Sequence, residues 1–177
     1  DRGTDYLYHT CQSGEEQPAL IRVQGSAAMY FNGAPHMGDP YGAGYMHIPV
    51  RLKKGLNELY IRGGNILPEI IPLKNEINIH TDDITAPHIV LNEQNGTLQI
   101  ALVVSNASQE TASQLSVTTT VQGKNKTSVV AAIPAFSTRK IFFEADASGV
   151  SQTGKYNCNV MLTSKGKSID EKTITLE

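Results

Sequence analysis

Apolar and polar residues alternate with a period of two along much of this chain, which is the pattern of a strand with one buried face. The clearest runs are residues 98–104, 115–121 and 156–162, where every second residue is apolar or Thr. No stretch repeats apolar residues at positions i, i+3, i+4 and i+7 over three turns, as an amphipathic helix would. The pattern therefore predicts an all-β protein.

Turn signals separate the predicted strands at short intervals. They are Asn32-Gly33, Lys54-Gly55, Asn95-Gly96, Gly123-Lys124-Asn125 and Lys165-Gly166. An Asn-Gly pair favours a two-residue hairpin because both central residues of that turn take positive φ. Short strands joined by such turns are typical of β-sandwiches.

A polar segment at residues 82–87 marks the expected boundary between two domains. Pro87 biases Ala86 toward an extended conformation, which suits a linker. Gly, Tyr and Pro are frequent before this segment, whereas Ser, Thr, Val and Ala are frequent after it. We therefore expect one domain over residues 1–83 and a second over residues 84–177.

The second domain is expected to contain seven strands, because seven runs of strand-like residues follow the boundary. The expected ranges are 87–92, 97–106, 113–122, 125–133, 136–145, 154–164 and 167–176. Seven short strands in a domain of this length are typical of an immunoglobulin-like sandwich.

One local motif also resembles the immunoglobulin fold. The segment Gly154-Lys155-Tyr156-Asn157-Cys158 is similar to the Gly-x-Tyr-x-Cys of strand F in that fold. The resemblance implies that the Tyr156 hydroxyl bonds to upstream backbone, pinning the corner before the strand. The expected strand B, residues 97–106, contains no Cys, and the chain contains no Trp. We therefore expect a generic immunoglobulin-like module, similar to the adhesion-type or CARDB-type modules of exported bacterial proteins.

The chain has two cysteines, Cys11 and Cys158, which lie far apart in the sequence. In an exported protein they could form a disulfide. The preferred interpretation is that both are reduced and act as small apolar side chains, since each lies in an alternating strand-like run.

An ordered set of motifs in the first half resembles the galactose-binding-like jelly roll. The matching residues are Tyr30, Asn32-Gly33, Val50, Leu52, Lys54-Gly55, Asn57, Leu59 and Ile61. Gly33 and Gly55 are expected to supply positive φ, and Asn32 and Asn57 to cap turns, so their expected role is structural. The family's fold is usually longer than 83 residues. Either the domain is reduced, or it is a partial jelly roll whose first part lies upstream of Asp1, which is the preferred interpretation.

The order of a jelly roll followed by an immunoglobulin-like module resembles the non-catalytic N-terminal region of exported bacterial serine hydrolases of the Bacteroidetes type. The resemblance is to enzymes of prolyl-oligopeptidase or carbohydrate-esterase type. It implies an accessory or spacer role, a covalently linked catalytic domain beyond Glu177, and a periplasmic, cell-surface or extracellular location. The chain itself contains no Gly-x-Ser-x-Gly nucleophile motif and no set of nucleophile, base and orienting residue. An autonomous hydrolase is therefore the least favoured interpretation.

The loop 36–47 gathers the most concentrated polar and aromatic residues. They are His36, Asp39, Tyr41, Tyr45 and His47, spaced by Gly38, Gly42 and Gly44. Aromatic rings with a few oriented polar groups suit a sugar, so a carbohydrate-binding module using this loop is the alternative function. In the competing and preferred interpretation the tyrosines pack the loop onto the sandwich and the histidines are solvated. A metal site at His36, Asp39 and His47 is the weakest reading because no complete ligand set is present, so we expect neither metal nor cofactor.

The charge balance restricts the class of partner. The chain has 15 basic and 17 acidic residues and a net charge of −2, whereas nucleic-acid binding normally needs a clustered basic surface. No apolar run reaches the 18 or more residues typical of a membrane-spanning helix. We therefore expect a carbohydrate or a covalently linked catalytic domain as the partner, with no nucleic acid and no membrane span.

Overall fold

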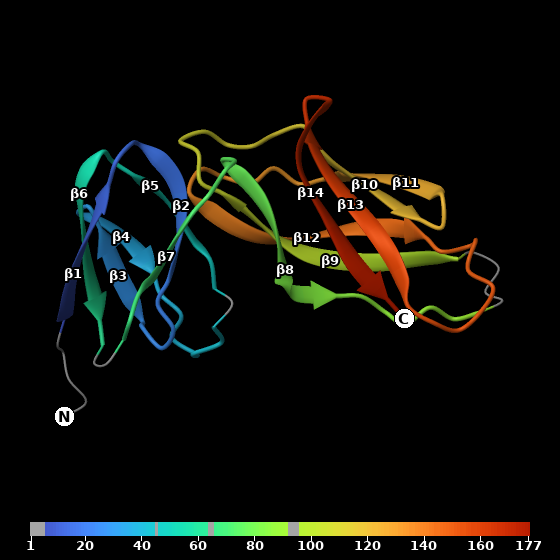
Figure 1. Cartoon of the computed structure of the whole chain (residues 1–177), viewed down its shortest axis with the longest axis horizontal. Coiled ribbons are helices and arrows are strands. Elements are labelled where there is room, and N and C mark those ends of the chain that lie inside the picture. Colours follow the sequence, from blue (N-terminus) through green and yellow to red (C-terminus); the bar gives the residue numbers. More distant parts are fainter. Residues whose placement is uncertain (1–5, 45, 64–65, 92–95) are drawn as a thin grey trace. The chain divides into compact units, whose positions relative to one another are not determined.

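The computed structural model describes residues 6–44, 46–63, 66–91 and 96–177. These residues form fourteen strands arranged in four sheets, and none of them lies in a helix (Figure 1). The all-β class expected from the alternating pattern is confirmed. Within the same ranges no helix qualifies as a candidate membrane span.

The chain divides into two compact units, each with its own core. The main segment of the first unit ends at Glu76, and this unit also includes Ala107–Gln109 and Phe136–Thr138. The second unit comprises Ile77–Asn106, Glu110–Ala135 and Arg139–Glu177.

Strand β8, Ile77–Thr85, occupies most of the segment where we expected a linker. It pairs with β9, Thr97–Asn106, and buries Ile79 in the second core. The division therefore precedes residues 82–87. The polar sequence of this segment is that of an outer strand of a sheet, whose exposed positions face water.

Seven strands form the first unit. They are β1 Tyr6–Ser13, β2 Gln17–Arg22, β3 Ala28–Phe31, β4 Ala34–Met37, β5 Ile48–Leu52, β6 Gly55–Arg62 and β7 Glu69–Pro72. One sheet has the order β1-β6-β3-β4 and the other has the order β5-β2-β7. Strand β5, which contains Pro49, lies at a sheet edge, where Pro is tolerated because its missing N–H costs no ladder bond.

Alternation explains how these strands bury their apolar side chains. In β6, Leu59 and Ile61 are fully buried while Tyr60 and Arg62 are exposed. The same alternation in β3 buries Met29 and Phe31 and exposes Tyr30. The inward residues of both sheets meet in one core. Its members are Ala19, Ile21, Val23, Met29, Phe31, Ile48, Val50, Leu52, Leu59, Ile61 and Ile66.

The hairpin between β3 and β4 has the two-residue turn that Asn-Gly chemistry favours. Asn32 has φ 49° and Gly33 has φ 84°, so both central residues are left-handed. The hairpin between β10 and β11 turns instead at Gln122 and Gly123, with φ 46° and 75°. That turn begins one residue earlier than expected, because Lys124 is already the first residue of β11.

The fully buried Asn57 and the half-buried Asn32 form an amide pair that connects the β3–β4 hairpin to the β5–β6 turn. Asn57 is fully buried, and its Oδ1 accepts from Asn32 Nδ2 at 2.9 Å and from the Lys53 N–H at 2.9 Å. Its Nδ2 donates to the carbonyls of Lys53 and Gly55 at 2.9 and 3.1 Å. Asn32 Oδ1 in turn accepts from the Glu58 N–H at 3.0 Å. Every polar atom of the buried Asn57 side chain is therefore satisfied inside the protein.

Seven strands form the second unit as well. Besides β8 and β9 they are β10 Leu115–Val121, β11 Lys124–Val130, β12 Ser137–Asp146, β13 Tyr156–Ser164 and β14 Lys167–Leu176. Their sheets have the orders β12-β9-β8 and β11-β10-β13-β14. In the immunoglobulin scheme these correspond to strands E-B-A and C′-C-F-G. Residues 87–91, the described part of the expected first strand 87–92, do not form a strand, so this expectation is wrong. Its place is taken by β8, and Ile89 instead donates its N–H to the Glu177 carbonyl at 2.6 Å.

The corner before β13 is built around Tyr156. Its hydroxyl donates to the Gln152 carbonyl at 2.8 Å, the contact that the immunoglobulin motif implies. Two residues later Cys158 is fully buried among the apolar residues of the second core, and burial raises its pKa to about 11. Both Cys158 and the half-buried Cys11 are free thiols.

Candidate functional site: a loop, a groove and an aromatic sheet face

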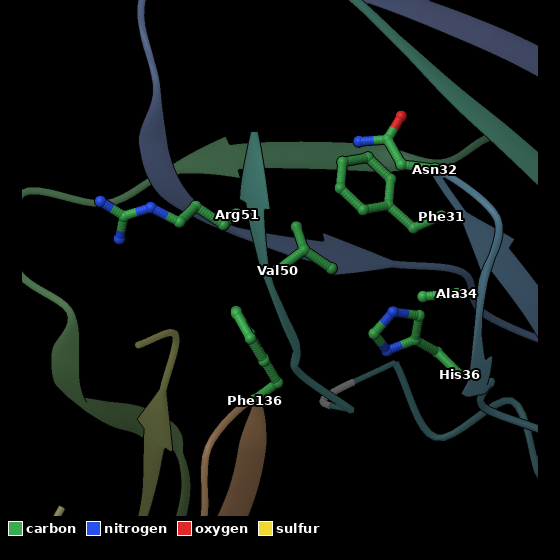
Figure 2. A pocket seen from close by; sticks show the side chains of 7 residues that line it. All are labelled: Phe31, Asn32, Ala34, His36, Val50, Arg51 and Phe136. Carbon is green, nitrogen blue, oxygen red and sulfur yellow. The ribbon is translucent and has the colours of Figure 1, made fainter. Parts of the chain in front are cut away.

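The first unit contains a small groove lined by residues of β3, β4 and β5. It has a volume of about 210 Å³, and its lining residues are Phe31, Asn32, Ala34, His36, Val50, Arg51 and Phe136 (Figure 2). Phe136 belongs to the short segment Phe136–Thr138, which is part of the first unit although it lies much later in the sequence. His36 is the single member of the predicted sugar-binding set that lines this groove. Burial lowers the pKa of its imidazole, so His36 is neutral at physiological pH.

The side chains that line the groove are mainly apolar. Figure 2 shows the guanidinium of Arg51 directed away from the rings of Phe31, His36 and Phe136. That guanidinium binds Glu16 at 2.5 Å and Glu76 at 2.8 Å, and these carboxylates raise its pKa. The volume is below the 300–1,000 Å³ or so that is typical of ligand cavities. The groove can therefore accept one small apolar group, and it offers no free charge.

Asp39 organises the loop from within. Only 2% of its surface is exposed, and its carboxylate accepts the N–H groups of Ala43 and Gly44 at 3.1 and 2.7 Å. Its carbonyl accepts the N–H groups of Gly25 and Gly42 at 2.9 and 3.1 Å. These bonds fold residues 39–44 around one carboxylate, so Asp39 serves the loop and leaves little of its bonding capacity for a ligand.

The other loop residues do not converge on a common point. Tyr41 is 95% exposed, so the expectation that it packs the loop onto the sandwich is wrong: Asp39 supplies the anchor instead. The expectation that the histidines are solvated is also wrong, since His47 is 4% exposed and His36 is half-buried. The His47 carbonyl accepts a hydrogen bond from Thr138 Oγ1 at 2.8 Å. Tyr45 lies outside the described residues.

No group of three or more His, Cys, Asp or Glu side chains within the described ranges is placed to hold a metal ion. His36, Asp39 and His47 thus do not form such a group. The loop is best described as a structured connection between β4 and β5 that projects one aromatic side chain, Tyr41, into solvent.

Sequence reasoning missed a different aromatic cluster on the outer face of the four-stranded sheet of the first unit. Tyr6, Tyr8, Tyr30 and Tyr60 are 40–52% exposed and lie at outward positions of β1, β3 and β6. The signal was present, because Tyr occurs at alternate positions in residues 6–8 and again at positions 30 and 60. Strand order alone brings these positions together. We refer to these four residues as the tyrosine face.

No protein-family model matches this chain, and no curated protein matches it. Solved structures do match in fold. The exo-chitosanase CsxA of Amycolatopsis orientalis is 13% identical, with a TM-score of 0.51 over 96% of this chain and 25% of that chain. A calcium-binding mutant of Bacteroides uniformis beta-glucuronidase 2 is 15% identical, with a TM-score of 0.48 over 96% of this chain and 26% of that one. A putative beta-galactosidase of Bacteroides fragilis is 18% identical, with a TM-score of 0.45 over 97% of this chain and 32% of that one.

This chain spans a quarter to a third of the length of these three structures, and a further similar structure is a beta-glucuronidase from glycoside hydrolase family 2. At such low identity the match to the chitosanase is informative about fold alone. It gives no support to the expected parent protein of the serine hydrolase type. The two β-sandwich units of this chain thus share their fold with a quarter of the chitosanase.

Proposed function

We propose that this chain is a non-catalytic accessory region of two β-sandwich units that belongs to a longer glycoside hydrolase. The observation that supports this most is the structural match to the chitosanase, which covers 96% of this chain but 25% of that enzyme. In such an arrangement the active site lies outside the matched quarter, and the sandwich units support or extend the catalytic part.

The chemistry of the described residues agrees with a non-catalytic role. Glycoside hydrolysis normally needs two carboxyl groups that face each other across the scissile bond. No acidic residue lines the groove of the first unit. The nearby carboxylates of Glu16 and Glu76 are both bound to Arg51, and that of Asp39 is buried in its loop. None of the three is placed as half of a catalytic pair in an open cleft.

Sugar binding by the loop 36–47 is not favoured as the function. It required Asp39 and the aromatic residues to act together, whereas Asp39 is engaged by the loop backbone and the Tyr41 side chain is 95% exposed to solvent. The location outside the cytoplasm and the covalently linked catalytic domain are parts of the proposal. Cell fractionation with an antibody to this chain would test the location.

Two measurements test the accessory role. The purified chain should give no turnover of nitrophenyl β-glucosaminide, β-glucuronide or β-galactoside, while the complete protein should hydrolyse at least one of them. The reading frame that encodes residues 1–177 should continue into a glycosidase catalytic domain. Turnover by the isolated chain, or a complete reading frame without any glycosidase domain, would contradict the proposal.

A further inference from the structure

The tyrosine face is ordered by strand register and not by local sequence. In the β1-β6-β3-β4 sheet, Tyr8 is directly opposite Tyr60, and Tyr60 is directly opposite Tyr30. The three side chains therefore form a straight row across three neighbouring strands. Tyr30 is in turn opposite Pro35 of β4, so the row extends to the far edge of the sheet.

Two rings of the row, those of Tyr8 and Tyr60, contact each other, and Tyr8 is also bonded to a carboxylate. The ring centroids of Tyr8 and Tyr60 are 4.8 Å apart, and the ring planes are tilted by 38°. The Tyr8 hydroxyl donates to Glu58 Oε1 at 2.7 Å, and this bond raises the pKa of Tyr8. A ligand would therefore meet pre-ordered rings, which lowers the entropic cost of binding.

The rings nevertheless keep much of their surface free. Exposed fractions are 52% for Tyr8, 43% for Tyr60 and 40% for Tyr30. Tyr6 lies beside this row on β1, opposite Arg62, and is 52% exposed. Four of the seven tyrosines of the chain thus share one solvent-facing surface. Such a concentration of exposed rings marks an interaction surface.

Charged residues on the central strand indicate what kind of partner fits. Glu58 and Arg62 precede and follow Tyr60 by two residues and so lie on the same outer face. Tyr and Arg are enriched at protein interfaces but Glu is depleted there, so Glu58 beside the central ring disfavours a protein contact. One acid and one base leave the centre without net charge, so a polyanion such as nucleic acid finds no attraction there.

We propose that the tyrosine face binds an uncharged polysaccharide chain that crosses the sheet along the row Tyr8, Tyr60, Tyr30. Sugar rings offer C–H faces that pack on aromatic rings and hydroxyls that bond to polar edges. The tyrosine rings supply the first kind of contact. The tyrosine hydroxyls, Glu58 and Arg62 supply the second kind. The biological role of this binding rests on the proposed accessory role of the chain, since a bound polysaccharide would be held near the linked glycosidase.

The test uses the full 177-residue chain. Its migration is measured in native gels that contain hydroxyethylcellulose, xyloglucan or galactomannan, and its sedimentation is measured with insoluble chitin. We expect retention by at least one of these polysaccharides. Tyr60→Ala should weaken that retention about tenfold or more, because it removes the central ring of the row. Tyr60→Phe keeps the ring and should retain most of the binding.

Tyr41→Ala is the matched control, because Tyr41 is an exposed tyrosine of the same unit that lies on the loop between β4 and β5 and not on a strand of the sheet. It should bind as the unchanged chain does. Circular dichroism and thermal melting establish that each variant is folded. Tyr8→Ala and Tyr30→Ala provide two further variants of the row if Tyr60→Ala does not fold.

Three outcomes would overturn the proposal. They are a folded chain that none of the four polysaccharides retains, a Tyr60→Ala variant that binds normally, and a dimer in analytical ultracentrifugation that Tyr60→Ala dissociates. The last result would mean that a second copy covers the face. Each of these outcomes leaves the accessory role standing, whereas a reading frame without a glycosidase would remove that role and leave the measured binding intact.

Discussion

The two units use the same arrangement of a four-stranded and a three-stranded sheet, yet their interiors differ. Among the described residues, the core cluster of the second unit has twenty buried apolar members and that of the first has eleven. Each unit also buries one side-chain amide: Asn57 in the first is bonded to Asn32 and joins two turns, and Asn106 in the second donates to the carbonyls of Glu110, Ile133 and Pro134. A small sandwich buries less apolar surface, so specific hydrogen bonds carry a larger share of its stability.

The outer faces of the four-stranded sheets differ just as clearly. The first unit presents the tyrosine face, whereas the second presents hydroxyl side chains that bond across its strands. Ser116 pairs with Thr163 at 2.7 Å, and Thr118 pairs with Thr127 at 2.9 Å. Hydroxyls that bond to each other suit a solvated spacer, while exposed rings suit contact with a partner. The same architecture therefore supports two different roles, which the outward residues decide.

The largest expected change in stability comes from substitutions in the two cores, one in each unit. Leu102→Ala in the second unit and Leu59→Ala in the first each remove a fully buried side chain. Each should lower the free energy of unfolding of its own unit by about 3–5 kcal/mol, because a cavity remains. Hydrogen exchange measured by mass spectrometry should show faster exchange in the altered unit alone. Equal acceleration in both units would contradict the idea of separate cores.

The next prediction concerns the hydrogen-bonded amides of Asn32 and Asn57 in the first unit. Asn57→Ala leaves the Lys53 N–H and the Lys53 and Gly55 carbonyls without their side-chain partner, so we expect a loss of about 2–4 kcal/mol. Asn32→Gly should cost less, about 1–2 kcal/mol, because Gly keeps the positive φ of the turn. Urea unfolding followed by tyrosine fluorescence measures both. A loss below 1 kcal/mol for Asn57→Ala would show that the first unit does not depend on this pair.

The buried thiol of Cys158 should give the second unit an alkaline effect of its own. The pKa of Cys158 rises from 9.0 in an exposed thiol to about 11 in the folded protein, because the residue is buried. Below pH 9 the thiol is protonated in both states and its stabilisation is complete. Between pH 9 and 11 the unfolded thiol ionises first, so the free energy of unfolding falls, by about 2 kcal/mol at most. The quantity to measure is the difference from Cys158→Ala, which should lack this component.

A smaller effect tests the corner of the second unit. Tyr156→Phe removes the hydroxyl that donates to the Gln152 carbonyl and should cost about 1 kcal/mol. The matched control is Tyr41→Phe, whose hydroxyl lies on a side chain that is 95% exposed, and it should change the melting temperature very little. Equal melting temperatures for the two variants would mean that the corner bond contributes nothing.

The smallest effect sharpens the contrast between the outer faces. Thr118→Val keeps the β-branched shape but breaks the hydroxyl pair with Thr127, so we expect a change of about 0.5 kcal/mol or less. It should also leave polysaccharide retention unaltered, in contrast to Tyr60→Ala. A loss of retention in Thr118→Val would show that binding is not confined to the first unit.

Local features of this chain could be predicted because local physics decides them. The turn at Asn32 and Gly33 follows from the positive φ that these residues tolerate, and the alternation in residues 156–162 follows from a half-buried strand. The candidate loop was harder to judge. The sequence shows that Asp39 stands among glycines, but the choice between a ligand contact and a bond to the Ala43 and Gly44 N–H groups depends on how the loop folds.

The sequence by itself determined the all-β class, most of the strands and the turns between them, because period-two alternation and positive-φ residues act over a few positions. It did not determine which strands become neighbours. Tyr8, Tyr30 and Tyr60 lie on three separate segments, and the β1-β6-β3 order with its register places them in one row. Long-range pairing is settled by the burial of the opposite faces in a shared core, so the surface most suited to binding exists only in the tertiary structure.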